Sequence, residues 1–232
     1  MSRLEWDQTQ KRYYHTGVSK VVLFVQNRYG EYEPGVAWNG FTGIEDNMNG
    51  GEENILWADN MKYAVLQSPD DYAGKLSVLQ YPPEFTQCNG EYQPVPGLLL
   101  TSQPRRAFAL VYRTEIGNGR SQEAGYMLHF IYGARVKPTT VERSTINNNP
   151  DAAKFEFEFY TMPITIAGYK PSSMVQVNSV QCSKGQAHAI ENIIYGTETT
   201  ESRLPFPEEL FDLVNEVFLL NVSLMDSTAY LG

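Results

Sequence analysis

The sequence has few of the residues that bind metals or act as nucleophiles. Its two cysteines, Cys88 and Cys182, lie far apart and outside any C-x-x-C spacing, so they neither require nor exclude a disulfide. Its three histidines, His15, His129 and His188, are scattered along the chain. We therefore expect no metal centre and no cofactor.

Long apolar runs are missing as well. The most apolar stretch, VFLLNVSLM near the C-terminus, has about half the length that a membrane-spanning helix needs. The first residues, MSRLEWDQTQ, lack the apolar run of a secretory signal. We therefore expect no membrane association, and synthesis in the cytoplasm.

Positively charged residues are fewer than negatively charged ones. Lys and Arg number 18 against 27 Asp and Glu, which gives a formal net charge of −9 and a pI near 4.9. Proteins that bind nucleic acid tightly do so through Lys and Arg side chains that neutralise phosphates. This balance argues against a basic nucleic-acid groove.

The chain is rich in aromatic and turn-forming residues. Phe, Tyr and Trp make up 12% of the 232 residues, beside 13 prolines and 18 glycines. This composition is typical of β structure with many turns. No internal repeat or low-complexity linker divides the chain. We expect a mainly-β domain at residues 18–204, an N-terminal arm at 1–17, and a C-terminal helix and tail at 205–232.

The strongest strand signal is RRAFALVYRTEIGNGRSQEAGYMLHFIYGARV, which predicts two strands around a polar loop. An earlier hairpin is predicted in SKVVLFVQNRYGEYEPGVAWNG, with its turn at Tyr29 and Gly30 and its second strand ending at Trp38. The side chains expected to align on one face of each central strand are Phe108, Leu110 and Tyr112, then Tyr126, Leu128, Phe130 and Tyr132.

The stretch KFEFEFY alternates phenylalanine with glutamate. A period of two predicts a strand with Phe155, Phe157 and Phe159 on one face and Glu156 and Glu158 on the other. Residues two apart on a strand lie roughly 6.5 Å apart, close to the carboxylate separation of inverting glycosidases. The solvent face of an antiparallel strand also carries charge without catalysis, and we favour this second interpretation.

Two helices are predicted towards the C-terminus. In SKGQAHAIENIIYG, Ser183 and Gln186 form a capping box and Gly196 ends the helix, at about 183–195. Its apolar stripe is Ala187, Ile190 and Ile194. In PFPEELFDLVNEVFLL, the residues at helical spacing are Leu210, Phe211, Val214, Val217 and Phe218.

Two further segments are assigned from local signals. SPDDYAG, residues 68–74, predicts a short helix, because Ser68 suits the cap and Pro69 the first turn. The polar, glycine-rich segment from Gly40 to Asn54 predicts a long exposed loop.

Two motifs resemble known sites but lack essential residues. GNGRSQ at 117–122 begins like a dinucleotide fingerprint, but its third glycine is missing. EDNMNGGEENIL resembles a calcium loop, but it begins with Glu45 and closes with Leu56 in place of a bidentate Glu. His129 is expected to be structural rather than a general base. Since G-x-S-x-G and H-E-x-x-H are absent too, no enzymatic activity is expected.

The central segment, continued to INNNPDAAKFEFEFYTMPI, resembles the major tail protein, or tail tube subunit, of long-tailed, siphovirus-type bacteriophages. LEWDQTQKRYYHTGVSKVVLF, GVAWNG, WADNMKY and YPPEF contribute to the resemblance, which covers about residues 4–207. It is strongest in YRTEIGN and GYMLHFIYG of the central hairpin. The C-terminal FDLVNEVFLLNVSLMDSTAYLG departs from the family.

The resemblance implies a β-sandwich or half-barrel flanked by a helix. Six copies would form a ring, and stacked rings would form a tube that conducts DNA during genome ejection. The partners would be further copies and other tail proteins of the virion, such as the tape measure, baseplate or tail terminator. Six copies at −9 carry −54 per ring, so DNA would pass through the lumen without specific binding.

The resemblance also suggests which residues make contacts. Glu156 and Glu158 are candidates for lining the lumen, and Trp6, Tyr13 and Tyr14 of the arm would contact a neighbouring subunit. Two loops, Gly40–Asn54 and Gly117–Gly125, would join stacked rings. Their candidate residues are Glu45, Asp46, Asn47, Asn118, Arg120 and Gln122.

Functions of other classes stay open. A carbohydrate- or receptor-binding β-sandwich of a phage baseplate would show exposed Trp and Tyr side chains in a groove and would form only a small oligomer. A glycosidase built on Glu156 and Glu158 would need a concave site and one raised carboxyl pKa. Nothing else in the sequence indicates either.

Overall fold

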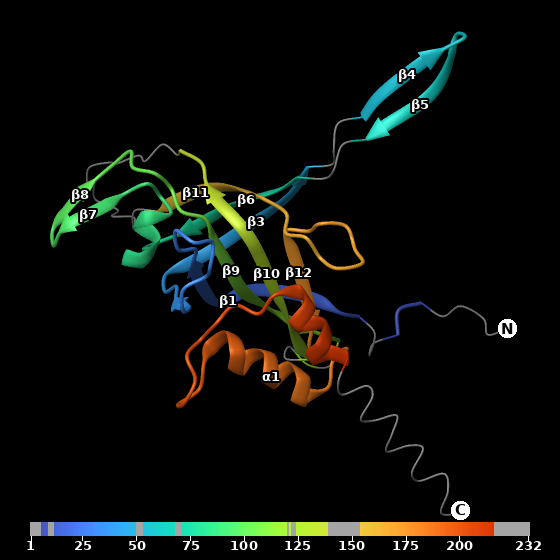
Figure 1. Ribbon diagram of the computed structural model, residues 1–232. Helices are drawn as coiled ribbons and strands as arrows, with labels where there is room; N and C mark the ends of the chain where they lie inside the picture. The colour runs from blue at the N-terminus through green and yellow to red at the C-terminus, as the bar shows by residue number, and fades with distance from the viewer. Residues whose placement is uncertain are drawn as a thin grey trace, which may run out of the picture.

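The computed structural model describes residues 6–8, 12–49, 53–67, 71–119, 121, 124–138 and 154–215. The fold is mainly β, with two helices beside the strands, as the sequence predicted. An eight-stranded sheet forms the body, and two separate two-stranded hairpins extend from it (Figure 1).

The sheet has the strand order β2-β1-β9-β10-β11-β6-β3, with β12 as a further neighbour of β10. Its strands are β1 (Tyr14–Val25), β2 (Val36–Ala37), β3 (Phe41–Asn49), β6 (Asp71–Val78), β9 (Phe108–Gly117), β10 (Gly125–Val136), β11 (Phe155–Thr161) and β12 (Met174–Asn178). The separate hairpins are β4 (Glu53–Ala58) with β5 (Met61–Gln67), and β7 (Tyr92–Val95) with β8 (Leu98–Leu100). The central hairpin predicted from the sequence is β9–β10.

Strand β10 has two different neighbours along one edge. Its residues 127–131 pair with β12, and its residues 134–136 pair with β11. Between them, the pairing with β9 on the other edge shifts register. Gly133 lies at this bulge with φ 62°, a left-handed conformation that favours glycine. The bulge turns β10 from one neighbour to the other and so bends the sheet.

The bend encloses a core between the two parts of the sheet. Alternate side chains of β1, β9 and β10 face the inner side of β11 and β6, together with Phe85 of the 3₁₀-helix η2 (Pro83–Gln87). The ring centroid of Phe85 lies 5.0 Å from that of Phe157 and 5.6 Å from that of Phe108, in edge-to-face contacts. Other buried members are Leu23, Val25, Leu76, Val78, Leu110, Tyr112, Ile131 and Phe159.

The opposite side chains of β1, β9 and β10 pack against the helices. The helix α1 (Lys184–Tyr195) and the helix at 207–215 lie on the same side of the sheet (Figure 1). Ile190 and Ile194 of α1 and Leu210 of the second helix are buried there. Val217 and Phe218, expected in the stripe of the second helix, lie outside the described residues.

The helix α1 begins after Ser183, at the capping box that the sequence predicts. The backbone N–H of Gln186 donates to Ser183 Oγ at 3.2 Å, and the backbone N–H of Ser183 donates to Gln186 Oε1 at 2.7 Å. This reciprocal pair confirms the capping box. Gly196, with φ 76°, ends the helix as expected.

Two local predictions are wrong. Residues 71–74 of the predicted short helix belong to β6, which pairs with β11 on one side and β3 on the other. The remainder of that segment, residues 68–70, lies outside the described residues. The predicted loop from Gly40 to Asn54 is largely strand β3. In both cases, pairing with neighbouring strands outweighs a weak local preference for a helix cap or a loop.

Replacement of Gly133 tests the origin of the bend. A Cβ at this position would lie 2.5 Å from the carbonyl oxygen of Met162, in a left-handed backbone conformation. We expect Gly133→Ala to lower the free energy of unfolding by about 3 kcal/mol or more, measured by urea denaturation. Gly17 has φ 63° but no heavy atom within 4 Å of its Cβ position, so the control Gly17→Ala should cost only about 1–2 kcal/mol. Equal losses would contradict a steric requirement at Gly133.

Candidate functional site

The outer face of strands β11 and β6 carries charged side chains. Glu156 and Glu158 of β11 are exposed, whereas Phe157 and Phe159 are buried, so the predicted alternation is confirmed. Lys75 of β6 is the register partner of Glu158, and its Nζ lies 2.6 Å from Glu156 Oε2. The two glutamates therefore share one face with a single lysine between the strands.

The same face continues onto β3. Glu45 of β3 is the register partner of Lys75 on its other side. One ammonium group thus lies among three carboxylates, and its hydrogen bond with Glu156 is the main cause that raises the pKa of Lys75. Surface pairs of this kind contribute little to stability, so the main property of this acidic face is its negative potential.

A catalytic role for these carboxylates would need a cleft. The pocket lined by Gln87 and Tyr92 and the pocket lined by Arg105 and Arg135 do not include Glu156 or Glu158. The acidic face consists instead of exposed side chains on paired strands.

Asp46 connects β3 to the core. Its carboxylate oxygens accept hydrogen bonds from the hydroxyls of Tyr72, at 2.5 Å, and Tyr112, at 2.8 Å. Burial, together with the Asp46 carboxylate, raises the pKa of both phenols. Because Tyr112 belongs to β9, this link joins strands that are not neighbours in the sheet. The prediction that Glu45, Asp46 and Asn47 lie in a loop is wrong, since all three lie in β3, but their predicted exposure is confirmed. Their role in contacts between stacked rings stays a prediction.

The turn between β9 and β10 contains the other candidate contact residues. The backbone N–H of Ser121 donates to Asn118 Oδ1 at 2.8 Å, and the backbone N–H of Asn118 donates to the main-chain carbonyl oxygen of Ser121 at 2.7 Å. Asn118 therefore shapes the turn itself. Arg120 and Gln122 lie outside the described residues, and the role of this turn in subunit contacts stays a prediction.

The N-terminal aromatic side chains are exposed. The exposed fractions of Trp6, Tyr13 and Tyr14 are 76%, 51% and 42%. Tyr14 is the first residue of β1, so the strand begins before the expected end of the arm at residue 17. Its ring covers Gly117, where a Cβ would lie 2.3 Å from Tyr14 Cζ. Contact of these residues with another subunit stays a prediction.

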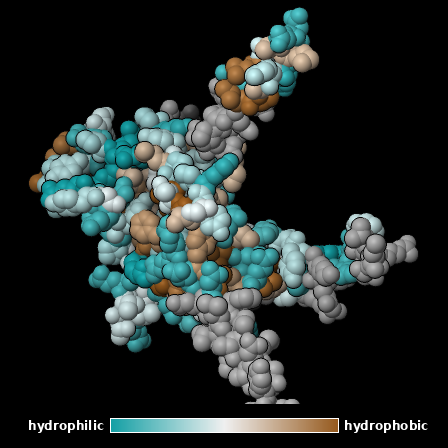
Figure 2. All heavy atoms as spheres, turned by 45° about the vertical axis from the view of Figure 1, so that its right-hand side comes forward, coloured by the Kyte–Doolittle hydropathy of each residue, from teal (hydrophilic) through white to brown (hydrophobic). Residues whose placement is uncertain are grey.

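The hairpin β4–β5 is a surface that was not predicted from the sequence. It projects from the body (Figure 1), and hydrophobic side chains are visible on it in Figure 2. Asp59 and Asn60 form its tight turn with φ 50° and 56°, as in a type I′ turn. The exposed large apolar side chains are Leu56, Trp57, Met61, Tyr63, Val65 and Leu66.

Both separate hairpins have the properties of contact surfaces. A two-stranded hairpin alone in water is marginally stable at best, and clustered exposed apolar side chains mark interaction sites. On β7–β8 and its turn the exposed apolar side chains are Tyr92, Val95, Leu98, Leu99 and Leu100.

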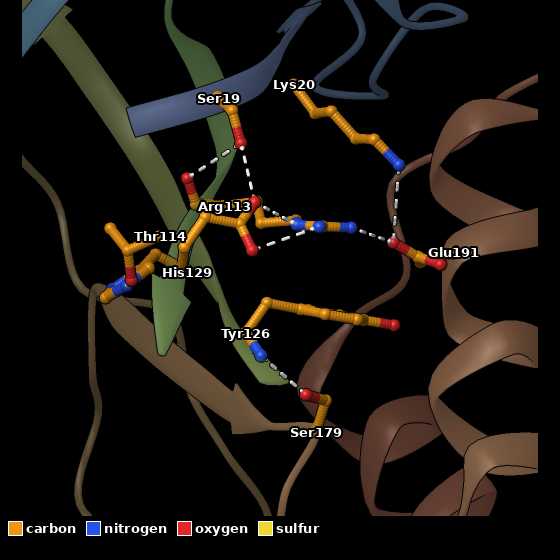
Figure 3. A network of polar contacts seen from close by, with 9 residues as sticks. Ser19, Lys20, Arg113, Thr114, Tyr126, His129, Ser179 and Glu191 are labelled. Carbon is orange, nitrogen blue, oxygen red and sulfur yellow. Dashed lines mark hydrogen bonds and ion pairs between the residues drawn. The ribbon is translucent and has the colours of Figure 1, made fainter. Parts of the chain in front are cut away.

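A polar network joins α1 to the sheet (Figure 3). The Arg113 guanidinium donates to the two carboxylate oxygens of Glu115, at 2.9 and 3.1 Å, and to Glu191 of α1 at 3.3 Å. Lys20 Nζ lies 3.8 Å from the same Glu191 oxygen. The Tyr126 ring lies 4.2 Å from the guanidinium carbon, and burial raises the pKa of its hydroxyl to about 12. Since two cations face two carboxylates, the charges balance, and we assign this network to the docking of α1.

His129 has hydrogen-bond partners at both ring nitrogens, in agreement with a structural role. It is 8% exposed, and its ring stacks on that of Tyr112 at 4.5 Å between centroids. Nε2 lies 2.9 Å from Thr114 Oγ1, and the side-chain amide of Gln176 lies 3.2 Å from Nδ1. This arrangement fits a neutral ring with its proton on Nε2. Burial lowers the pKa of His129.

The cysteines are both free. Burial raises the pKa of the Cys88 thiol to about 12, so it stays protonated at neutral pH. Within the described ranges, no group of three or more His, Cys, Asp or Glu could hold a metal ion. No helix of this part of the chain is long and apolar enough to cross a membrane.

Stability should depend on the protonation of His129. Its pKa in the folded protein lies below the ordinary value of 6.5. As the pH falls, His129 is therefore protonated in the unfolded chain before it is protonated in the folded protein. The free energy of unfolding should therefore fall as the pH drops through 6.5 towards the folded-state pKa. His129→Gln should lose this part of the pH dependence in urea titrations, whereas His188→Gln, at an exposed position, should keep it. An unchanged pH profile in His129→Gln would contradict the assignment.

Comparison with known proteins adds no relative: no protein-family model and no curated protein matches the sequence. A functional interpretation therefore depends on the surfaces themselves. These are the acidic face of β3, β6 and β11 and the two hairpins with exposed apolar side chains. Such surfaces suit contact with other macromolecules.

Proposed function

We propose that this chain is a structural virion protein, the tail tube subunit of a long-tailed bacteriophage. Hexameric rings of it would stack into a tube that conducts DNA during genome ejection. The observation that carries the proposal is the hairpin β4–β5, whose apolar side chains are exposed on a ribbon that projects from the folded body (Figure 2). Such a ribbon gains its burial from a neighbouring subunit in a stack of identical copies.

The edges of the sheet support assembly into a ring. Among the described strands, β2 and β3 end the strand order, and each pairs with a single neighbour. Unpaired strand edges are a hazard for a protein that stays alone, and closure of the sheet with neighbouring copies removes them.

The acidic face supports a tube that carries DNA. Glu45 of β3 and Glu156 and Glu158 of β11 lie on the two strands that flank β6, whose Lys75 is the cation among them. If this face lines the lumen, six copies form a negative wall, in keeping with the −54 that six chains at −9 carry. A wall of this sign repels phosphates, so that DNA slides through without adhering.

Electron microscopy of the concentrated, purified protein tests the proposal. We expect negatively stained fields to show stacked rings or tubes with a central channel. The variant Trp57→Ser/Tyr63→Ser should fold normally, because these side chains are 68% and 77% exposed, but it should form few or no tubes. Tyr169→Ser removes one aromatic ring that is 70% exposed on the loop between β11 and β12, and as the control it should assemble like the unchanged protein.

The opposite outcome would be discrete small particles under every condition, together with binding to bacterial surface polysaccharide. That result would contradict the tube and favour a carbohydrate- or receptor-binding module of the baseplate, with Trp57 and Tyr63 as its exposed aromatic side chains.

Charge reversal tests whether the acidic face lines the lumen. Glu156→Arg/Glu158→Arg should leave tube assembly intact, because both side chains are exposed. These tubes should retain double-stranded DNA in a co-sedimentation assay, whereas unchanged tubes should not. Glu198→Arg/Glu201→Arg makes the same change of charge on an exposed loop after α1. Equal DNA retention by both variants would contradict the assignment of the acidic face to the lumen.

A further inference from the structure

A pocket lined by four arginines lies where β1 and β10 end. Arg28 in the β1–β2 turn, Arg105 and Arg106 before β9, and Arg135 of β10 line this open pocket of about 410 Å³. The chain has only 18 Lys and Arg against 27 Asp and Glu. Four guanidinium groups at one place therefore depart from its acidic character.

Few carboxylates compensate these groups. In the described part of the chain, Arg106 forms an ion pair with Glu33 at 3.6 Å, and both side chains are partly exposed. Arg135 donates to the main-chain oxygen of Arg105 at 3.4 Å, which orients its side chain without neutralising it. Arg105 Nε is buried and has no hydrogen-bond partner among the described residues. The guanidinium groups of the pocket can therefore bind anionic groups in addition to the carboxylate of Glu33.

Two further contacts hold arginine side chains in place. The Arg28 guanidinium carbon lies 4.9 Å from the centre of the Tyr29 ring. Arg105 packs against Gly90, where a Cβ would lie 3.1 Å from Arg105 Cγ. Guanidinium groups that are already positioned lose less conformational entropy when they bind an anion.

The hairpin β4–β5 projects away from the body that holds this pocket (Figure 1). Asp59 at the turn of the hairpin is exposed. When identical copies assemble head to tail, an element that projects from one copy meets a different surface of the next copy. Asp59 is therefore one carboxylate that a second copy can bring to the pocket.

We propose that the arginine pocket binds carboxylate side chains of a second copy of this chain, an inference that rests on the proposed function and specifies the contact between stacked rings. Two copies that each carry −9 repel one another, so their contact needs local positive charge. Guanidinium groups bind carboxylates through paired hydrogen bonds. They bind phosphates equally well, but the net negative charge of the chain opposes the approach of nucleic acid.

Self-association of the full chain, measured by sedimentation velocity, tests this contact. Arg28→Glu should raise the Kd of self-association by roughly tenfold or more, as expected for loss of a close charge contact at an interface. Arg28 is exposed, so the monomer fold should be retained, which circular dichroism would check. Lys170→Glu makes the same change of net charge at an exposed position outside the pocket and should leave the Kd almost unchanged.

The outcomes separate this contact from the tube itself. If Arg28→Glu and Lys170→Glu associate equally well, the pocket proposal is overturned and the tube proposal stands. If the unchanged protein does not associate at any concentration, both are overturned. A fluorescent double-stranded oligonucleotide is the third arm: binding that Arg28→Glu abolishes, with unchanged self-association, would assign the pocket to nucleic acid and overturn the proposal.

Discussion

The whole arrangement depends on one strand, β10, which has two neighbours on the same edge. Its first part pairs with β12 and its last part with β11, and the change takes place at Gly133, beside the carbonyl oxygen of Met162. If β10 continued beside β12 alone, then β11, β6 and β3 would have no place in the sheet. The enclosed core, the acidic face and the hairpin that follows β3 would all be lost with them. A steric constraint at one glycine therefore fixes where the exposed surfaces lie.

Much of the fold could be predicted from local patterns. The alternation in β11 and the capping box of α1 were confirmed, because each is determined by residues next to one another in the chain. Strand β3 was missed because its residues are mostly polar, and a polar strand resembles a loop. Its Asp46 is stabilised by Tyr72 and Tyr112, which come from distant parts of the sequence. No local pattern could reveal those partners.

The candidate site was predicted only in part, for similar reasons. Alternation alone placed Glu156 and Glu158 on one exposed face. The hairpin β4–β5 did carry a signal that was overlooked, because Asp59 and Asn60 form a two-residue turn between the runs ENILWA and MKYAVLQ. The arginine pocket has no such signal, because the strand order alone brings its residues together from the β1–β2 turn, the segment before β9 and the end of β10.

The strand order also determines how the chain reaches its native state. β9 and β10 follow one another in the sequence and pair as a hairpin, whereas β1 pairs with β9 across a large part of the chain. Sheets that depend on such distant pairings fold slowly. The chain loses conformational entropy when a long loop closes, and the stabilising contacts between the distant strands form only afterwards. The local hairpin is therefore expected to form early, with β1 and the β11–β6–β3 part joining later. Between these steps, the edges of β9 and β10 are open to other chains, and this interval is the one in which aggregation competes most strongly with folding.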